Sequence, residues 1–366
     1  MIKVKIGNIF ESKMEVLVNT INCVGVMGKG IACDFKKKYP EMFKEYKALC
    51  DQHIIKTGEL YPYLENNKVK VINFPTKQHW RSPSKIEYIT EGLQWFVDHY
   101  KELNIRSIAF PPLGCGNGDL SWDYIESIMY QYLKDIPIDI EIYAPYNTSF
   151  NKMTKSFLEF KPNREVQSIG VKYKKINYKW FLPLQIVKCL NNSKYDVLVG
   201  RVVFQKICFV LSRYGIDLGL KFVKGTYGPY SEDIKEMITI LSNNNYIYEK
   251  QVGKSICLSV SDQFKIDKSL YTKEEVQIVN KVYFLFKGIR NASQAEILTT
   301  ILFSYDELSK QYDSITENML YGYVHEWKQS HDDFRDESKI RDFIKSLFFD
   351  KMIDIDYSKD FVDDYF

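Results

Sequence analysis

The chain has 366 residues, enough for two domains of ordinary size, and its 45% apolar and 27% charged residues are typical of a globular protein in water. No apolar run approaches the length of about 18 residues that a membrane helix needs, and the initial MIKVKIGNIFE alternates like a strand, without a signal-peptide core. Seven scattered cysteines without a CxxC pair, and five histidines without metal-ligand spacing, lead us to expect no disulfide framework, no metal and a cytoplasmic protein.

Strand-like and helix-like segments alternate along the first 150 residues. The strand-like segments span residues 2–6, 15–20, 68–74, 106–110 and 138–144. Apolar residues at helical spacing lie between them, at residues 31–46, 86–100 and 121–133. Ser84 and Glu87 form a capping-box pattern before the second of these helices. The alternation predicts an α/β fold with a largely parallel sheet.

Three unusual loops follow strands of this predicted sheet. NCVGVMGKG follows the strand that ends near Thr20, and PTKQHWRSPS follows the strand that ends at Phe74. PPLGCGNGDLSW follows the strand that ends at Phe110. Ligands of such sheets bind beyond the carboxyl ends of the strands, so we expect the three loops to meet at one edge and to form the functional site.

The sequence changes in character near residue 150. Residues 153–175 are polar and weakly periodic, which indicates a linker between a first domain of residues 1–152 and a second of residues 176–366. The second domain is expected to be mainly helical, with one strand pair within residues 246–260. Its helices are predicted at residues 180–190, 201–215, 231–241, 273–286 and 293–305.

The formal net charge of +3 hides an uneven distribution. Residues 151–300 carry 24 basic and 13 acidic side chains, whereas residues 301–366 carry 8 basic and 16 acidic ones. An acidic surface repels nucleic acid and attracts a basic protein face. A solvated acidic helix face with a frayed tail explains the same pattern equally well.

Two glycine-rich turns, at residues 25–30 and 114–118, precede predicted helices. Exposed backbone N–H groups at such a turn form an anion site together with the helix dipole, and two turns at one edge suit a diphosphate. Neither turn matches a Walker or dinucleotide fingerprint. In the first turn, Gly30 follows Lys29 and Cys33 stands where a third glycine is needed. The second turn has the glycine spacing but lacks an acidic residue about 20 positions later at the end of a following strand. The pattern alone favours phosphate binding over tight-turn packing.

Four motifs in this order resemble the macrodomain family, whose members bind ADP-ribose: VNTIN, GVMGKGIACDFKKKYP, FPTKQHWRSPS and PPLGCGNGDLSW. The resemblance covers about residues 1–150 and is closest to the branch that contains terminal ADP-ribose glycohydrolase and the DarG antitoxins. It implies a three-layer α/β/α macrodomain with a mixed, largely parallel sheet, followed by a mainly α-helical domain. The segment FQKICFVLSRYG…KFVKGTYGPYSEDI is also similar to a helical domain of other antitoxins.

The resemblance assigns the ADP-ribose contacts to residues of these loops. Asn22 corresponds to the family asparagine beside the distal ribose. Asn8, with Ile9 after it, stands where many members carry an acidic residue for the adenine amino group. The remaining expected ADP-ribose contacts are Gly28, Lys29, Gly30, Ile31, Thr76, Leu113, Gly114, Cys115, Gly116, Asn117 and Gly118.

Lys77 corresponds to the lysine on which glycohydrolase activity in this branch depends. Its amine has two possible roles: attack on the anomeric carbon or its ring-opened aldehyde, or stabilisation of the leaving base as a charged group. The eukaryotic glycohydrolase pairs its lysine with an aspartate where this chain has Gly118. Either Asp119 therefore takes the acid-base role from a shifted position, or water or substrate does. Asp119 is equally suited to cap the helix that starts near Ser121.

Other side chains near the loops have two interpretations each. Cys115 is interpreted as a packing residue rather than a nucleophile, because no histidine is placed to activate it. Trp80 either stacks on a base of single-stranded DNA or pins its own loop. Arg81 either contacts the DNA backbone or is an ordinary solvated charge.

The resemblance implies two compatible functions. The macrodomain is expected to remove ADP-ribose from thymidine in single-stranded DNA by N-glycosidic hydrolysis, without a cofactor and with ADP-ribose as the bound product. The C-terminal domain is expected to sequester a DarT-like toxin, a DNA ADP-ribosyltransferase. We expect no membrane partner, and a monomer or a 1:1 toxin complex. The alternative is a module that binds ADP-ribose without turnover and acts only through protein interaction.

Overall fold

The computed structural model of the chain describes residues 1–146, 148–149, 153, 176–192, 198–252, 255–262, 264–329 and 331–356. Backbone packing divides the chain into two compact units, Met1–Lys174 with Ile238–Asn244, and Lys175–Met237 with Asn245–Phe366. The domain limits 1–152, 153–175 and 176–366 stay predictions, and all of the expected linker except Met153 lies outside the described residues. No helix in the described part of the chain is long and apolar enough to cross a membrane.

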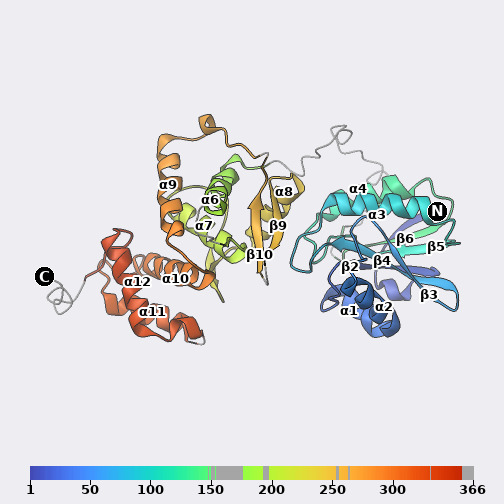
Figure 1. The fold of residues 1–366 in the computed structure, drawn as a ribbon, viewed down its shortest axis with the longest axis horizontal. Coiled ribbons are helices and arrows are strands. Elements are labelled where there is room, and N and C mark those ends of the chain that lie inside the picture. Colours follow the sequence, from blue (N-terminus) through green and yellow to red (C-terminus); the bar gives the residue numbers. More distant parts are fainter. Residues whose placement is uncertain are drawn as a thin grey trace. The chain divides into compact units, whose positions relative to one another are not determined.

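A six-stranded mixed sheet forms the centre of the first unit (Figure 1). Its order is β1-β6-β5-β2-β4-β3, and every neighbouring pair is parallel except the edge pair of β3 and β4. The strands are β1 (Ile2–Ile6), β2 (Val16–Asn22), β3 (Tyr61–Glu65), β4 (Lys68–Lys77), β5 (Ser107–Phe110) and β6 (Asp139–Ala144). The predicted mixed, largely parallel sheet is confirmed, and β3 is an additional strand.

Helices cover both faces of this sheet, which gives the three expected layers (Figure 1). One face carries α1 (Gly30–Lys38) and α2 (Pro40–Asp51), and the other carries α3 (Ile86–His99) and α4 (Trp122–Leu133). The single helix predicted over 31–46 is in fact two helices, because Pro40 cannot continue α1 and starts α2 instead.

The predicted capping box before α3 is wrong. The N-cap residue is Lys85, whose own side chain makes no capping hydrogen bond. The backbone N–H of Ser84 donates instead to the carbonyl of Gly118, at 2.9 Å. Ser84 therefore ties the loop before α3 to the loop before α4.

The apolar core under α1 and α2 also holds the loop that follows β2. Met27, in the middle of that loop, is 4% exposed and belongs to a buried cluster with Phe35 and Met42. Burial of a side chain of this size contributes about 1.5–3 kcal/mol. The loop is thus anchored at its centre.

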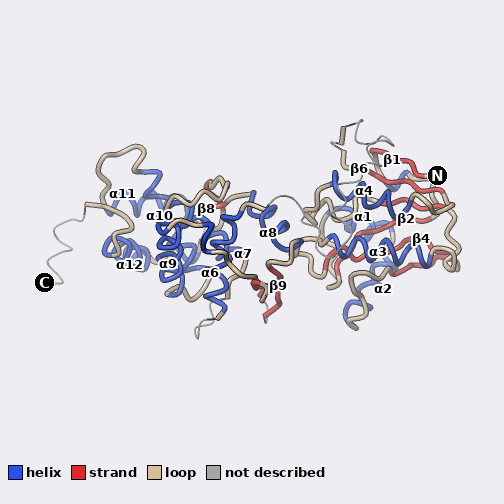
Figure 2. Tube along the Cα trace, turned by 90° about the horizontal axis from the view of Figure 1, so that it is seen from above, coloured by secondary structure: helices blue, strands red, loops and turns tan. Residues whose placement is uncertain are grey.

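The second unit is mainly helical, as predicted (Figure 2). The helices after residue 176 are α6 (Phe181–Asn191), α7 (Arg201–Arg213), α8 (Asp233–Asn243), α9 (Lys273–Lys287), α10 (Ala292–Leu308), α11 (Glu317–Lys328) and α12 (Glu337–Phe349). The expected hairpin is formed by β9 (Ile247–Val252) and β10 (Ser255–Val260). A shorter hairpin of β7 (Val223–Gly225) and β8 (Gly228–Tyr230), and helices α11 and α12, were not predicted. Short 3-10 helices span Ile9–Glu11, Tyr178–Trp180, Lys268–Leu270 and Asp332–Phe334.

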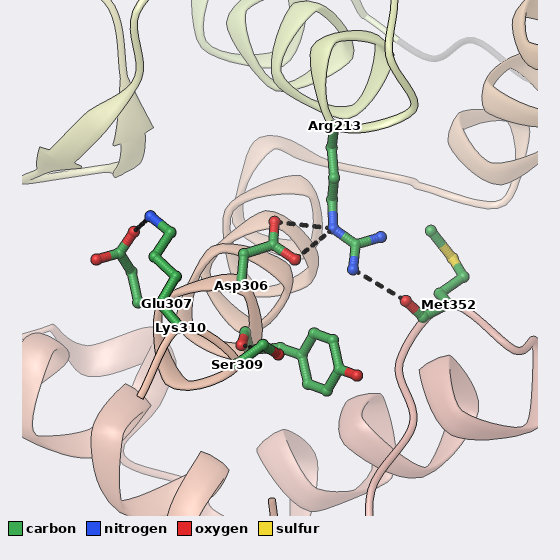
Figure 3. A network of polar contacts seen from close by, with 7 residues as sticks. Arg213, Asp306, Glu307, Ser309, Lys310 and Met352 are labelled. Carbon is green, nitrogen blue, oxygen red and sulfur yellow. Dashed lines mark hydrogen bonds and ion pairs between the residues drawn. The ribbon is translucent and has the colours of Figure 1, made fainter. Parts of the chain in front are cut away.

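An arginine network joins three segments of this second unit (Figure 3). Arg213, at the end of α7, donates through Nε to both carboxylate oxygens of Asp306 on α10, at 2.9 Å each. Its Nη2 donates to the carbonyl of Met352, at 3.1 Å. Similarly, Arg341 on α12 pairs with both Glu317 and Glu337. Part of the acidic charge of residues 301–366 is therefore neutralised within the unit.

Candidate active site

The sheet order places the carboxyl ends of β2, β4 and β5 side by side, so the three loops share one edge, as predicted. Asn22, the last residue of β2, pairs in register with Lys77, the last residue of β4. Residues 23–29, which follow β2, are called the first glycine loop below, and residues 111–121, which follow β5, the second glycine loop. The two residues that the sequence motifs singled out most strongly thus end neighbouring strands.

The side chain of Asn22 folds the first glycine loop back on itself. Asn22 is 7% exposed, and its Oδ1 accepts hydrogen bonds from the N–H groups of Val24, at 3.0 Å, and Val26, at 3.4 Å. Its Nδ2 donates to the carbonyl of Val26, at 2.6 Å. The hydroxyl of Tyr46, on α2, lies 3.1 Å from the same Oδ1 and 2.9 Å from the Asn22 carbonyl. Asn22 therefore has a structural task in addition to the predicted ribose contact.

The first glycine loop leads into an uncapped helix end. Gly28, Lys29 and Gly30 are exposed, whereas Ile31 is half-buried against the core. Lys29 is the N-cap residue of α1, and within the described residues no side-chain capping hydrogen bond satisfies the first-turn N–H groups. Such N–H groups, with the positive end of the helix dipole, favour an anion.

Lys77 is buried where the loops meet. It is 8% exposed, next to Thr76 at 4%, and its Nζ donates to the backbone carbonyl of Asn117 in the second glycine loop. Cys23 holds the backbone here, because its Sγ donates to the Lys77 carbonyl at 3.3 Å and its N–H to the Gln78 carbonyl at 3.1 Å. Burial raises the pKa of the Cys23 thiol to about 12, so the thiol remains protonated and can donate.

The second glycine loop reaches the first through Asn117. A Cβ on Gly30, whose φ is +61°, would lie 3.0 Å from Nδ2 of Asn117. Both Asn117 and the adjacent Gly116 are exposed, and a Cβ on Gly116 would meet no atom within 4 Å. Asn22, Lys77 and the 116–117 turn therefore surround one region.

Gly118 accounts for the departure from the eukaryotic pattern. A Cβ at this position would lie 2.3 Å from both the Gly114 carbonyl oxygen and Ser84 Oγ, so the backbone leaves no room for a carboxylate. The predicted alternative, Asp119, is half-buried on the same turn, with φ of +61°. Ser121 is the N-cap residue of α4, so Asp119 does not occupy the capping position.

The sulfur of Cys115 is unsuited to nucleophilic attack. Burial, and secondarily the negative charge of Glu126, raise the pKa of this thiol well above its usual range. The thiol donates to the carbonyl of Leu113, a fully buried residue, at 3.4 Å. This environment favours the packing interpretation, and any contact of Cys115 with ligand involves its backbone.

Asn8 and Ile9 lie farther along the same edge, because β6 and β5 separate β1 from β2. The Oδ1 of Asn8 accepts the N–H of Phe10 at 3.1 Å and so caps a short 3-10 helix. Ile9 is 4% exposed in the core. Because the Asn8 side chain caps a helix and Ile9 is buried, both residues can border the site mainly through their backbone atoms.

Trp80 and Arg81 form a stacked surface after Lys77. Trp80 is 44% exposed, the guanidinium carbon of Arg81 lies 4.5 Å from its ring centroid, and the ring of His79 stacks on it at 5.5 Å. The N–H of Arg81 also donates to His79 Nδ1, at 3.2 Å. The loop thus pins itself, and it also presents an aromatic and cationic surface to solvent, so both interpretations of Trp80 are compatible with the structure.

Three residues of the site were missed by sequence reasoning. Tyr46 had the pattern of an ordinary apolar position of a helix, Ser84 was assigned to a cap, and Cys23 was not distinguished from the other cysteines. Each acts through a contact distant in sequence, to Asn22, Gly118 and Lys77 respectively. Periodicity carries no signal for such contacts.

Comparison with known proteins gives a consistent assignment. Residues 18–129 match the Macro domain family. The DNA ADP-ribosyl glycohydrolase of Mycobacterium tuberculosis (strain ATCC 25618 / H37Rv) is 36% identical over 237 residues, 63% of this chain and 64% of that protein. This chain therefore covers slightly less than two thirds of that relative's length.

Two further matches cover smaller shares of the chain. A DNA ADP-ribosyl transferase-DNA ADP-ribosyl glycohydrolase fusion protein of Thermosipho africanus is 34% identical over 157 residues, 38% of this chain and 40% of that protein. The solved macrodomain of Mycobacterium tuberculosis DarG is 44% identical, and the match covers 40% of this chain and 98% of that one with a TM-score of 0.38. The family match thus falls within the N-terminal unit, at residues 18–129, and the chain is similar to DNA ADP-ribosyl glycohydrolases.

Proposed function

We propose that the N-terminal unit binds ADP-ribose and hydrolyses its bond to a base in DNA. The observation that carries the proposal is the burial of Lys77 between the two glycine loops, with Nζ at the Asn117 carbonyl. Support also comes from the mycobacterial relative, which is a DNA ADP-ribosyl glycohydrolase. ADP-ribosylated thymidine in single-stranded DNA is the proposed substrate, and ADP-ribose is the product that stays bound, without a cofactor.

In this proposal, backbone N–H groups bind the negative charge of the diphosphate, and Lys77 acts on the glycosidic bond. The N–H groups of the first turn of α1 and of the 114–118 turn hold the diphosphate. Asn22 meets the distal ribose. The reaction adds the hydroxyl of water to the anomeric carbon and a proton to the thymine nitrogen that leaves.

The amine of Lys77 serves this reaction in one of two ways. As a neutral nucleophile it forms a bond to the anomeric carbon while the bond to thymine breaks, and water then hydrolyses the intermediate. As an ammonium group it stabilises the negative charge that develops on the leaving base. Because a carboxylate cannot be accommodated at Gly118, proton transfer falls to Asp119 or to water.

Replacement of the lysine tests the proposal. We expect Lys77→Ala to lower turnover of thymidine-ADP-ribosylated single-stranded DNA at least 100-fold, since it removes the reacting amine, while ADP-ribose still binds. Lys68→Ala, at the exposed opposite end of β4, is the matched control and should retain turnover. Unmodified oligonucleotide is quantified over time.

Two outcomes count against this assignment. Turnover by Lys77→Ala at the rate of the Lys68→Ala control contradicts the catalytic role. Binding of ADP-ribose by the wild-type chain without any release of unmodified DNA supports the alternative, a non-catalytic module that acts only through protein interaction.

We further propose that the C-terminal unit sequesters a DarT-like toxin. The Thermosipho africanus relative joins a DNA ADP-ribosyl transferase and a DNA ADP-ribosyl glycohydrolase in one chain, which favours a partnership of the two activities. The acidic charge of residues 301–366 suits a basic DNA-binding groove, and long-range attraction of this kind accelerates association. The aromatic and acidic end at residues 357–366 lies outside the described residues.

The Lys77→Ala variant, which we expect to lack turnover, separates toxin sequestration from catalysis. We expect the full chain with Lys77→Ala to inhibit the toxin's modification of single-stranded DNA once the two proteins are equimolar, because inhibition then needs only binding. Inhibition should weaken as salt is raised. Unimpaired DNA modification at a several-fold excess of this variant contradicts the sequestration role.

A further inference from the structure

We propose that Tyr46 is a positioning residue of the ADP-ribose site, which it reaches from α2 beneath the first glycine loop. Its hydroxyl fixes the plane of the Asn22 carboxamide and thereby sets the loop against the backbone of Lys77. Tyr46 is 1% exposed and acts through Asn22 rather than on the ligand itself. The inference rests on the proposed binding of ADP-ribose.

The hydrogen bonds around Asn22 determine the orientation of its amide. Oδ1 accepts from the N–H groups of Val24 and Val26, at 3.0 and 3.4 Å, and the hydroxyl of Tyr46 lies 3.1 Å from it. Nδ2 faces one acceptor, the Val26 carbonyl, at 2.6 Å. A flipped amide would direct its own N–H groups at these donors, so this contact set selects one orientation.

This orientation leaves one polar group of Asn22 for a ligand. Nδ2 carries two N–H groups, and the Val26 carbonyl takes one of them. The second makes no hydrogen bond to any residue that the structure describes. Its direction follows from the carboxamide plane, which the Tyr46 hydroxyl helps to fix. A rotated plane would misdirect this donor from a ribose hydroxyl.

The same loop is tied to both α2 and β4. A Cβ on Gly25, whose φ is +75°, would lie 3.5 Å from Cγ of Lys47 and 3.6 Å from Cβ of Cys50, so the loop rests directly on α2. Cys23, next to Asn22, donates to the carbonyls of Lys77 and Gln78. A shift of the loop on α2 is therefore transmitted to the backbone that carries Lys77.

The chemistry of the buried phenol suits this task. Burial, and secondarily Cys50, raise the pKa of Tyr46 well above its usual range, so the hydroxyl stays protonated at every physiological pH. Its proton is donated to the Asn22 carbonyl or to Oδ1, both of which are acceptors. Phenylalanine at this position keeps the ring packing and removes the hydroxyl, with its hydrogen bonds to Asn22 and its contacts with Gly25 and Cys50.

The test compares Tyr46→Phe with wild type and with Tyr63→Phe in the full chain. Tyr63 is buried in the same apolar cluster, but makes no hydrogen bond to residues 22–30 of the described chain. Calorimetry measures ADP-ribose affinity, and kinetics on ADP-ribosylated single-stranded DNA give KM and kcat. Both are measured at a temperature well below the midpoint of thermal unfolding of each variant. We expect Tyr46→Phe to raise Kd and KM about tenfold, with the smaller change in kcat, and Tyr63→Phe to match wild type.

Two further variants make the assignment specific. Asn22→Ala should weaken binding, and adding Tyr46→Phe to it should change the affinity little more, because both act through one contact. 4-Aminophenylalanine at position 46 retains a donor in the same place and should restore wild-type affinity. This variant also tests the donor role if Tyr46→Phe does not fold.

The outcomes separate this inference from the proposed function. Wild-type protein that gives no heat with ADP-ribose contradicts the proposed function itself. Wild-type binding together with equal Kd and KM for folded Tyr46→Phe overturns the positioning role. Fully additive effects of Tyr46→Phe and Asn22→Ala, or a lack of rescue by the amino analogue, overturn it as well.

Discussion

Gly118 shows how one residue limits the chemistry of this site. Its missing side chain allows the second glycine loop to close on itself, since the Gly114 carbonyl occupies the space of a Cβ. The Gly118 carbonyl also accepts the N–H of Ser84, which fixes the loop to the segment before α3. A carboxylate therefore cannot simply be introduced at this position by substitution.

Gly118→Asp should lower the free energy of unfolding by at least about 2 kcal/mol, because backbone must move to admit the side chain. It should not increase turnover. Gly116→Ala is the matched control: its Cβ meets no atom within 4 Å, so its stability should change by less than about 0.5 kcal/mol. Urea unfolding of the two variants measures the difference, and equal stability would contradict the packing argument.

At the scale of single residues, the sequence motifs predicted which residues lie at the site. Asn22, Lys77 and the 116–117 turn were each recognised from local sequence, and the structure brings them together. Their roles toward ligand stay predictions. Tyr46 could not be found in this way, because its value lies in a contact with a residue 24 positions earlier in the chain.

At the scale of secondary-structure elements, buried lysines hold the hairpin of β7 and β8 in place. Lys206 from α7 and Lys328 from α11 are each 1% exposed. Nζ of Lys206 donates to the Pro229 carbonyl at 2.8 Å, and Nζ of Lys328 donates to the Thr226 carbonyl at 2.5 Å and to Glu296 at 2.6 Å. Burial lowers the pKa of Lys206 to about 7. The negative charge of Glu296 opposes this shift, and the positive charge of Lys328 adds to it.

This arrangement makes stability depend on pH. From about pH 7 up to the ordinary lysine pKa of 10.5, the unfolded chain binds a proton that folded Lys206 has lost. Stability should therefore rise with pH, by at most about 1.4 kcal/mol per unit. Lys206→Met should remove this slope, and it should lower stability at pH 7 by about 1–3 kcal/mol, because the Pro229 carbonyl loses its buried donor. Urea unfolding at pH 7, 8 and 9 measures both.

Exposed Lys221 provides the control for this experiment. Lys221→Met should keep the wild-type slope, since this side chain is exposed to solvent and lies outside the buried lysine cluster. Equal slopes for Lys206→Met and wild type would show that Lys206 is not the group that loses the proton.

Most elements with strong periodicity were predicted, and the exceptions have physical causes. β3 is a short antiparallel edge strand with an exposed outer side, so its apolar signal is weak. Pro40 divides a continuous helical pattern into α1 and α2. The hairpin of β7 and β8 has three residues per strand and is held by buried lysines, which a sequence pattern assigns to the surface.

The whole molecule combines two units with different surface chemistry. The first gathers backbone donors and lysines at the edge of its sheet, which suits an anionic nucleotide. The second carries the acidic residues 301–366, and ion pairs such as those of Arg213 with Asp306 and of Arg341 with Glu317 neutralise part of this charge internally. Composition predicted the acidic excess, but only the contacts show how much of it is already paired.

Calorimetric titration of the full chain with ADP-ribose tests most directly whether the two glycine loops and Lys77 form one nucleotide site. We predict heat of binding to a single site, a comparable signal for Lys77→Ala, and none for adenosine, which lacks the diphosphate that we propose the loops bind. The absence of heat with ADP-ribose at concentrations up to about 1 mM, where even weak specific sites fill, would contradict the site.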